Sequence, residues 1–174
     1  RTTVLSDQSG TASAINDRGE ITGYFFVGVG NSFVWRGGQV TEIPLLPEMP
    51  EASMMQAQGI NNRGQVVGFG GFDGFVWDSD TGTLSTLPGL TRLGPAAYDI
   101  NDRGQIAGTV GNRTTSRFRA VVWQDGQIVD ITPAGPDCAA TAINERGEIV
   151  GQCNGVATLW RKGDGPKQKR PTFA

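Results

Sequence analysis

Residues 15–23 read INDRGEITG, and three later stretches repeat the same pattern of Ile-Asn, one variable residue, Arg-Gly, then a β-branched residue and a second glycine. The later copies are residues 60–68 (INNRGQVVG), 100–108 (INDRGQIAG) and 143–151 (INERGEIVG). Their asparagines, Asn16, Asn61, Asn101 and Asn144, follow one another at intervals of 45, 40 and 43 residues. A period in this range is typical of proteins built from repeated supersecondary units.

The motif predicts a tight hairpin turn. An Asn at the first position and a Gly at the fourth suit a type I turn followed by a residue with positive φ. The Asn side chain can accept hydrogen bonds from the backbone of its own turn. The second glycine falls inside a strand, where it lowers stability unless another group must approach closely. We expect a neighbouring sheet or a Trp ring to be that group.

Each repeat also contains a short apolar run that ends in Trp, and three repeats add a run that alternates apolar and polar residues. The Trp-ending runs are residues 32–35, 74–77, 120–123 and 157–160, and the alternating runs are residues 40–43, 84–87 and 128–131. Short β-branched and aromatic runs bounded by turn residues indicate strands. Four strands in about 43 residues match one propeller blade. The sequence therefore predicts an all-β, four-bladed β-propeller.

The two ends of the chain suggest how such a ring would close. Residues 2–5 (TTVL) resemble the fourth strand of a repeat, whereas the last repeat has no clear fourth strand after Trp160. We expect this N-terminal strand to complete the last blade. The predicted organisation is a single domain over residues 1–165 and a basic C-terminal tail over residues 166–174. The absence of an initiator Met and of a signal-peptide pattern suggests a mature or trimmed product.

Composition argues against several functions. The chain has 174 residues, which suits one domain core. Its formal net charge of −2 argues against a general nucleic-acid binder. No apolar stretch approaches the roughly 18 residues of a membrane span, so we expect no membrane insertion. Histidine is absent, which removes imidazole catalysis and His-ligated zinc. The sequence predicts no metal site and no cofactor.

The two cysteines, Cys138 and Cys153, flank the hairpin of the fourth repeat and form a candidate disulfide. Register is the difficulty, because pairing Ile143 with Ile149 sets Cys138 opposite Asn154. The bridge therefore requires an irregular strand end. The alternative is two unlinked small hydrophobic side chains.

The fourfold Ile-Asn-x-x-Gly-x-Ile-x-Gly pattern resembles the HAF repeat family, a group of exported bacterial β-repeat proteins. The resemblance covers roughly residues 10–162. In the family a His-Ala-Phe precedes the Trp, whereas here only Phe33 and Phe75 keep the aromatic residue. The resemblance implies a β-propeller-like fold and a secreted or periplasmic location. It implies no catalytic residue.

Because successive strands run in opposite directions, the loops between them lie at two opposite ends of the sheets. The turns after Asn and after Trp share one end and hardly vary, while the remaining loops share the other end and differ in length. Insertions confined to one face of a repeat protein usually mark its binding face. The ligand-binding candidates at this variable end are Arg113, Arg117, Arg119, Tyr24, Asp73, Tyr98 and Asn154. The alternative is that these are ordinary solvated loop residues.

Two other features suggest sites. Asp99 is charged at the position before Ile-Asn, where the other repeats have Ala14, Gly59 and Ala142. In a propeller, Asp99 would face the central channel. The motif arginines would form a ring able to hold an anion through bidentate contacts, although a solvated turn is the favoured interpretation. These arginines are Arg18, Arg63, Arg103 and Arg146.

We therefore expect an extracytoplasmic binding module whose partner is a carbohydrate, another cell-surface polymer or a protein. The ligand would bind at the variable end or in the central channel. The preference for carbohydrate rests on fold analogy alone. One alternative is a His-free hydrolase or lyase that uses carboxylates or Tyr in the central pocket. Another is the structural half of a larger dimeric propeller. A monomer is favoured over a dimer.

Overall fold

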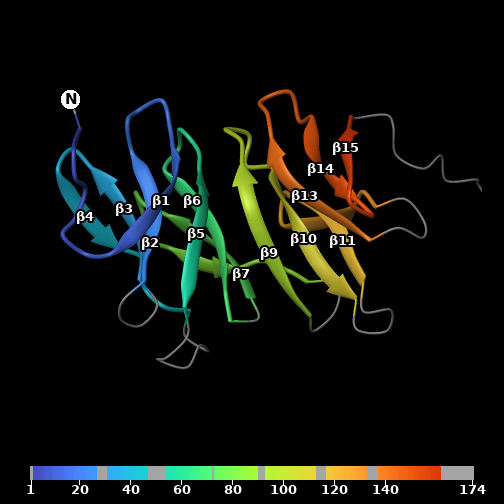
Figure 1. The fold of residues 1–174 in the computed structure, drawn as a ribbon, viewed down its shortest axis with the longest axis horizontal. Coiled ribbons are helices and arrows are strands. Elements are labelled where there is room, and N and C mark those ends of the chain that lie inside the picture. Colours follow the sequence, from blue (N-terminus) through green and yellow to red (C-terminus); the bar gives the residue numbers. More distant parts are fainter. Residues whose placement is uncertain are drawn as a thin grey trace, which may run out of the picture.

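The structure is a computed structural model that describes residues 2–26, 31–46, 54–71, 73–89, 93–112, 117–132 and 137–161. Within these ranges the regular secondary structure consists of β-strands alone, and the strands form four antiparallel sheets (Figure 1). Among the described residues no helix has the length and apolarity needed to cross a membrane. The all-β prediction is confirmed.

Each sheet is a meander in which strands that are consecutive in the chain are neighbours. The first sheet contains β1 (Gly10–Ile15), β2 (Ile21–Phe25), β3 (Ser32–Arg36) and β4 (Gln39–Glu42). The second contains β5 (Met55–Ile60), β6 (Gln65–Gly70), β7 (Asp73–Asp78) and β8 (Leu84–Thr86). The third contains β9 (Leu93–Ile100), β10 (Ile106–Asn112), β11 (Arg117–Gln124) and β12 (Gln127–Asp130). The fourth contains β13 (Cys138–Ile143), β14 (Ile149–Cys153) and β15 (Val156–Trp160).

The motif forms the predicted turn in every sheet. The fourth residue, a glycine, has a φ between 74° and 79° in all four copies. Its backbone N–H donates to the carbonyl of the motif Asn, at 2.9–3.1 Å. The Asn side chain accepts from the backbone N–H groups two and four residues further on, as Asn101 does from Arg103 (3.1 Å) and Gln105 (3.0 Å). The turn is therefore specified locally, by the Asn and the Gly.

A β-bulge interrupts the first strand of every sheet at the same place. The register shifts between Ala12 and Ala14 in β1, and at the corresponding places in β5, β9 and β13. The second motif glycine lies opposite each bulge. A Cβ on Gly108 would overlap the carbonyl oxygen of Ala96 and the ring of Trp123. Close approach of the partner strand and of an aromatic ring therefore explains this glycine, and the expectation of a Trp ring is met in the third sheet.

The bulge also explains how the disulfide forms. Cys138 and Cys153 are bridged, with their Cα atoms 4.1 Å apart. The shift lies between Ala140 and Ala142, so Cys138 pairs with Cys153 while Ile143 still pairs with Ile149. One extra residue in β13 removes the conflict of register that the sequence posed.

Adjacent sheets pack face to face, and a hydrophobic core fills each of the three junctions. We call the face of a sheet toward the start of the row its N-side face, and the opposite one its C-side face. In the first junction, Val34 on the C-side of the first sheet packs with Ile60, Val66 and Trp77 on the N-side of the second. The next two junctions repeat this arrangement with equivalent residues. Alternation along each strand therefore buries both faces of the inner sheets.

The prediction of a closed four-bladed propeller is wrong. The four sheets stand in an open row, with the first and the fourth at opposite ends (Figure 1). Strand contacts join neighbouring sheets, and no comparable contact joins β13–β15 with β1–β4 in the described ranges. Residues 2–5 form no strand and do not complete the fourth sheet. The repeat dictates strands and apolar faces, but the angle between successive sheets decides between ring and row, and the motif does not encode that angle.

Candidate functional site

Side-chain contacts join the Asn turns of successive sheets and fix their spacing. The Nδ2 of Asn16 donates to the backbone carbonyl of Asn61, one repeat later, at 2.9 Å. The same bond runs from Asn61 to Asn101 (3.0 Å) and from Asn101 to Asn144 (3.0 Å). We call this series the asparagine ladder. It holds the motif arginines at regular places along one end of the row.

Because the row is open, the motif arginines follow one another along it and do not form the ring that a propeller would have given. Arg63 donates to the carbonyl of Asp102 (3.5 Å), and Arg103 donates to the carbonyl of Glu145. Arg18 pairs instead with Glu20 (2.7 Å) within its own turn. A single anion therefore cannot reach all four guanidinium groups.

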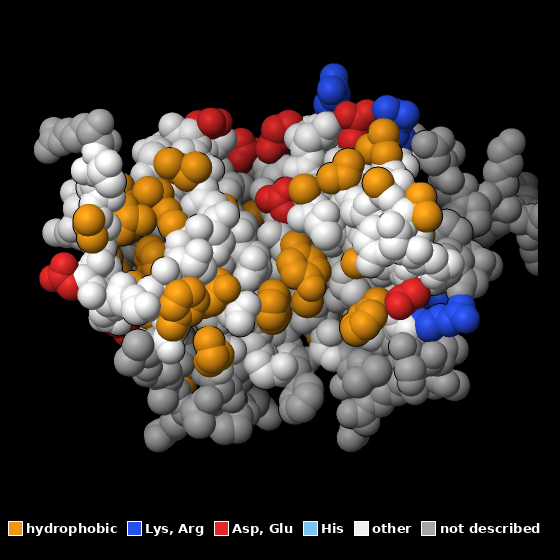
Figure 2. Space-filling view, viewed as in Figure 1, with side chains coloured by type: hydrophobic (Ala, Val, Ile, Leu, Met, Phe, Trp, Pro, Cys, Tyr) orange, Lys and Arg blue, Asp and Glu red, His pale blue; other side chains and the backbone are white. Residues whose placement is uncertain are grey.

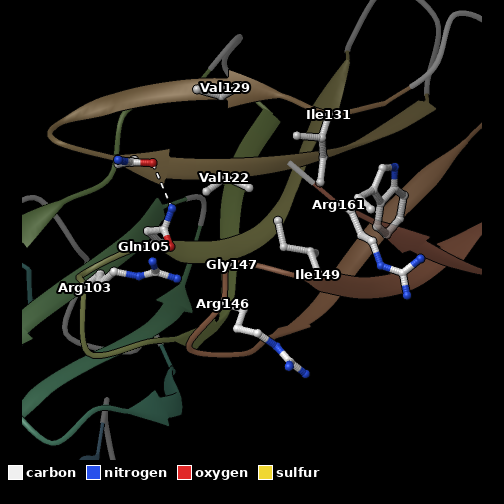
Figure 3. Close-up of a pocket in the computed structure, with 11 residues that line it drawn as sticks. Arg103, Gln105, Val122, Val129, Ile131, Arg146, Gly147, Ile149 and Arg161 are labelled. Carbon is white, nitrogen blue, oxygen red and sulfur yellow. Dashed lines mark hydrogen bonds between the residues drawn. The ribbon is translucent and has the colours of Figure 1, made fainter. Parts of the chain in front are cut away.

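A groove of about 270 Å³ lies between the third and fourth sheets, at the end of the row that carries the Asn turns (Figure 3). Its floor is apolar and is formed mainly by Val122, Ile131, Ile149 and Trp160. Three arginines also line it, namely Arg103, Arg146 and Arg161, and no acidic side chain does. In Figure 3 these three side chains come from separate segments on either side of the junction. The groove thus combines an apolar surface with a local excess of positive charge.

One carboxylate next to the groove orients two of the arginines. Glu148 pairs with Arg146 (3.3 Å) and Arg161 (3.1 Å), and it accepts a bond from Asn144 (2.8 Å). The hydrogen bonds from Asn144 and Arg161 lower the pKa of Glu148 below its ordinary value of 4.5, against a smaller opposing effect of desolvation. Within the described ranges Arg103 forms no ion pair with a carboxylate, and its guanidinium donates to the backbone carbonyl of Glu145. Positive charge at the groove is therefore only partly neutralised.

The preceding junction has a similar groove with a different charge. It measures about 230 Å³ and is lined by Ile106 and Trp123 at the places taken by Ile149 and Trp160. Its lining contains Asp125 and no arginine. The indole N–H of Trp123 donates to the carbonyl of Pro88 (2.7 Å), whereas that of Trp160 is buried with no partner among the described residues. The indole N–H of Trp77 is likewise buried with no partner among the described residues. The arginines therefore distinguish the groove beside the fourth sheet from the preceding one, and the unpartnered indole does not.

The candidates of the variable end are spread along the row and share no described groove. Tyr24 lies in the first sheet with its ring against Phe26 (centroids 5.9 Å apart), and Asp73 is exposed at the start of β7. In the third sheet Arg117 is exposed. Arg119 pairs with Asp130. Arg113 lies outside the described residues. In the fourth, Asn154 has positive φ and accepts a bond from the backbone of Asp137 (2.9 Å).

Asp99 and Tyr98 prove to be junction residues, and the open row has no central channel for them to face. One oxygen of Asp99 accepts from the backbone of Ile100 (2.9 Å), and the other from that of Ile143 in the fourth sheet (2.8 Å). Burial raises the pKa of Asp99, these two bonds oppose the rise, and Glu145 adds to it. Tyr98 packs edge-on against Phe69, and burial raises its pKa.

Sequence reasoning found Arg103 and Arg146 and missed Arg161 and the floor of the groove. A signal was available, because the fourth repeat has Arg-Gly-Glu in its motif and a basic residue after its Trp, whereas the second and third repeats have Gln at the Glu position. The first repeat has the same three residues, but no sheet precedes it in the row. No family model matches this chain, and no curated protein matches it.

Proposed function

We propose that this protein is an extracytoplasmic binding module that holds an acidic carbohydrate, or a similar anionic segment of a cell-surface polymer, in the groove between the third and fourth sheets. The observation that carries the proposal is the set of three arginines above an apolar floor that contains Trp160. Guanidinium groups bind carboxylates bidentately, and an aromatic or aliphatic floor suits the C–H face of a sugar ring.

Size and context agree with this ligand class. A groove of about 270 Å³ is at the lower limit of ordinary ligand pockets, so it suits one or two sugar rings of a longer chain. The disulfide is typical of proteins that work in an oxidising compartment. The protein as a whole is acidic at net −2, so attraction of an anionic polymer requires a local site of this kind.

The sequence-based alternative of a hydrolase or lyase at Asp99 has no comparable observation behind it. Both carboxylate oxygens already accept backbone hydrogen bonds, one from the neighbouring Ile100 and one from Ile143 of the fourth sheet. A general acid or base must be free to exchange a proton with a substrate. We therefore favour binding over catalysis.

Calorimetric titration with trigalacturonate tests the proposal. We expect the wild-type protein to bind it, and the double variant Arg103→Ala/Arg161→Ala to bind at least about tenfold more weakly, because both removed charges line the groove. The methyl-esterified trisaccharide, which has lost its carboxylates, is the ligand control. Equal affinity for the ester, or no binding to the wild-type protein, contradicts the proposal.

Arg117→Ala is the matched protein control, since Arg117 is an exposed arginine at the variable end. Its affinity for trigalacturonate should equal that of the wild-type protein. A loss as large as that of the double variant would place the ligand at the variable loops and not in the groove.

A further inference from the structure

The bonds of the asparagine ladder all run in one direction. Asn16, Asn61 and Asn101 each donate to the repeat that follows and never to the one before. The ladder therefore has two different ends. Asn144 has the donor that its counterparts use between sheets, but no sheet follows it in the described part of the chain. Its Nδ2 donates to Glu148 of its own turn (2.8 Å). At the other end, the carbonyl of Asn16 has no preceding Asn.

A second series, made of backbone N–H donors, runs beside the first with the same direction, while the side chain of Asn62 also donates back to Asp17 Oδ2 (2.8 Å). The backbone N–H of Asp17 donates to Asn62 Oδ1 (2.8 Å), and that of Asn62 donates to Asp102 Oδ1 (2.7 Å). The N–H of Asp102 then donates to Glu145 Oε1 (2.9 Å). By the same rule, the N–H of Glu145 lacks a following acceptor, while Asp17 has a carboxylate oxygen in the accepting position.

The motif arginines show the same pattern. The side chains of Arg18, Arg63 and Arg103 each lie next to the left-handed glycine of the following turn, within 4 Å of where its Cβ would be. Nothing lies within that distance at Gly19, the glycine of the first turn. Arg146, the last motif arginine, has no following glycine to cover. Three independent contacts are thus complementary at the two ends of the row.

Each terminal face exposes apolar side chains at positions that the inner junctions bury, while Phe25 and Phe33, on the N-side of the first sheet, are only 5% and 3% exposed. Ile15, on the N-side of the first sheet, is 66% exposed, whereas its equivalent Ile60 is 7% exposed. On the C-side of the fourth sheet, Val150 is 45% and Leu159 is 42% exposed, against 0% for Val67, the equivalent of Val150. In Figure 2, which views the row from the side, hydrophobic side chains are visible along its whole length, including both ends. The inner junctions bury the equivalent positions. Both ends of the row therefore expose the same kinds of apolar side chain that fill a junction.

The C-side face of the fourth sheet is also hollow. A depression of about 270 Å³ is lined there by Ala142, Ile143, Asn144, Glu148, Val150 and Leu159. In the inner junctions, the corresponding face receives the Ile, Val and Trp side chains of the next sheet. The first sheet carries the matching set on its N-side face, namely Ile15, Ile21 and Trp35.

From these complementary ends we infer that the protein associates head to tail, with the N-side face of the first sheet of one copy on the C-side face of the fourth sheet of another. The new junction would continue the asparagine ladder from Asn144 to Asn16 of the second copy. A second copy is the partner that carries the donors, the acceptors and the apolar set together. Such a contact is heterologous, so it leaves one free face at each end and permits further addition of copies. This inference does not depend on the proposed ligand.

Blocking each face separately tests the inference. Ile15→Arg and Val150→Arg each place a charge on one of the two faces, at positions exposed enough to accept it without unfolding the chain. Sedimentation velocity over roughly 1–500 μM should show concentration-dependent association of the wild-type protein. Each variant alone should weaken association at least about tenfold. Phe118→Arg, an exposed hydrophobic residue in the third sheet, should associate like the wild-type protein.

A mixture of the two variants gives the sharpest outcome. Ile15→Arg keeps a free fourth sheet and Val150→Arg keeps a free first sheet, so a 1:1 mixture should form heterodimers and no larger species. Failure of the mixture to associate overturns the inference, and so does undiminished self-association of either variant alone, which would show that like faces meet. A wild-type protein that stays monomeric over the whole concentration range also overturns it. Circular dichroism of each variant establishes that the sheets are intact.

Discussion

The turns at Asn101 and Asn144 have almost the same sequence, yet they have different neighbours. Asn101 is buried and donates to the carbonyl of Asn144 in the next sheet (3.0 Å). Asn144 makes the same bonds within its own turn but is exposed, because no sheet covers it in the described part of the chain. The motif therefore has two separable roles. It closes a hairpin wherever it occurs, and it joins two sheets only where another sheet follows.

The largest expected effect is that of removing the inner asparagine. Asn101→Ala leaves two backbone N–H groups of its turn and one carbonyl of the next without their partner, so we expect the free energy of unfolding to fall by about 3 kcal/mol. Asn144→Ala should cost about 1 kcal/mol, since water reaches the groups it leaves. Urea denaturation measures both values. Equal losses would mean that the contact between sheets contributes nothing.

The disulfide should have the next largest effect, and it distinguishes the fourth sheet from the other three. That sheet has three described strands, and the bridge spans 15 residues of its hairpin. Replacing both cysteines by Ala releases this loop in the unfolded chain, which predicts a loss of about 3 kcal/mol. Denaturation of the oxidised, reduced and double-Ala proteins tests this, and a reduced protein as stable as the oxidised one would contradict it.

Acid should affect the two terminal sheets unequally. Burial favours a higher pKa for Glu20, but bonds from Asn16 and Arg18 and the charges of Arg36 and Arg18 outweigh it and lower the pKa below the ordinary 4.5. A carboxyl group whose pKa is lower in the folded than in the unfolded protein stabilises the fold fully at pH values above its unfolded-state pKa. This stabilisation is lost as the pH falls through the folded-state pKa. The pKa of Glu148 is lowered too, but its side chain is 27% exposed, against 4% for Glu20.

We therefore expect Glu20→Gln to flatten the dependence of stability on pH below 4.5 more than Glu148→Gln does. Chemical denaturation at a series of acidic pH values measures the slopes. If Glu148→Gln flattened the slope of stability against pH more than Glu20→Gln did, the burial of Glu20 would not explain the difference between the two turns.

The smallest change in stability should come from breaking an ion pair that lies within a single sheet. Arg119 and Asp130 pair between adjacent strands of the third sheet, and both side chains are partly exposed. Solvent screens such a pair, so Arg119→Ala should change the free energy of unfolding by about 0.5 kcal/mol or less. A loss comparable to that of Asn101→Ala would remove the distinction between contacts within a sheet and contacts between sheets.

The sequence predicted part of the candidate site. Arg103 and Arg146 stood out because they recur, but recurrence suggested a ring, and the open row sends each to a different neighbour. Arg161 and Trp160 were not selected, because their role depends on which side of the fourth sheet meets the third. Asp99 stood out as the exception among the repeats, and the structure places it at the junction of the third and fourth sheets. Its partner, the backbone of Ile143, lies 44 residues away and no local pattern indicates it.

The residues by themselves determined the local structure. Asn and Gly at fixed spacing close the four turns, alternation gives the strands their two apolar faces, and the cysteines of the last repeat lie close enough to be joined. Each of these depends on neighbours in the chain. Only the tertiary structure decided the bulge at Thr141 that brings the cysteines into register, the groove lined by arginines, and the open row with unlike ends. These depend on the angle between packed sheets, which is set by many side chains from distant repeats and by no single motif.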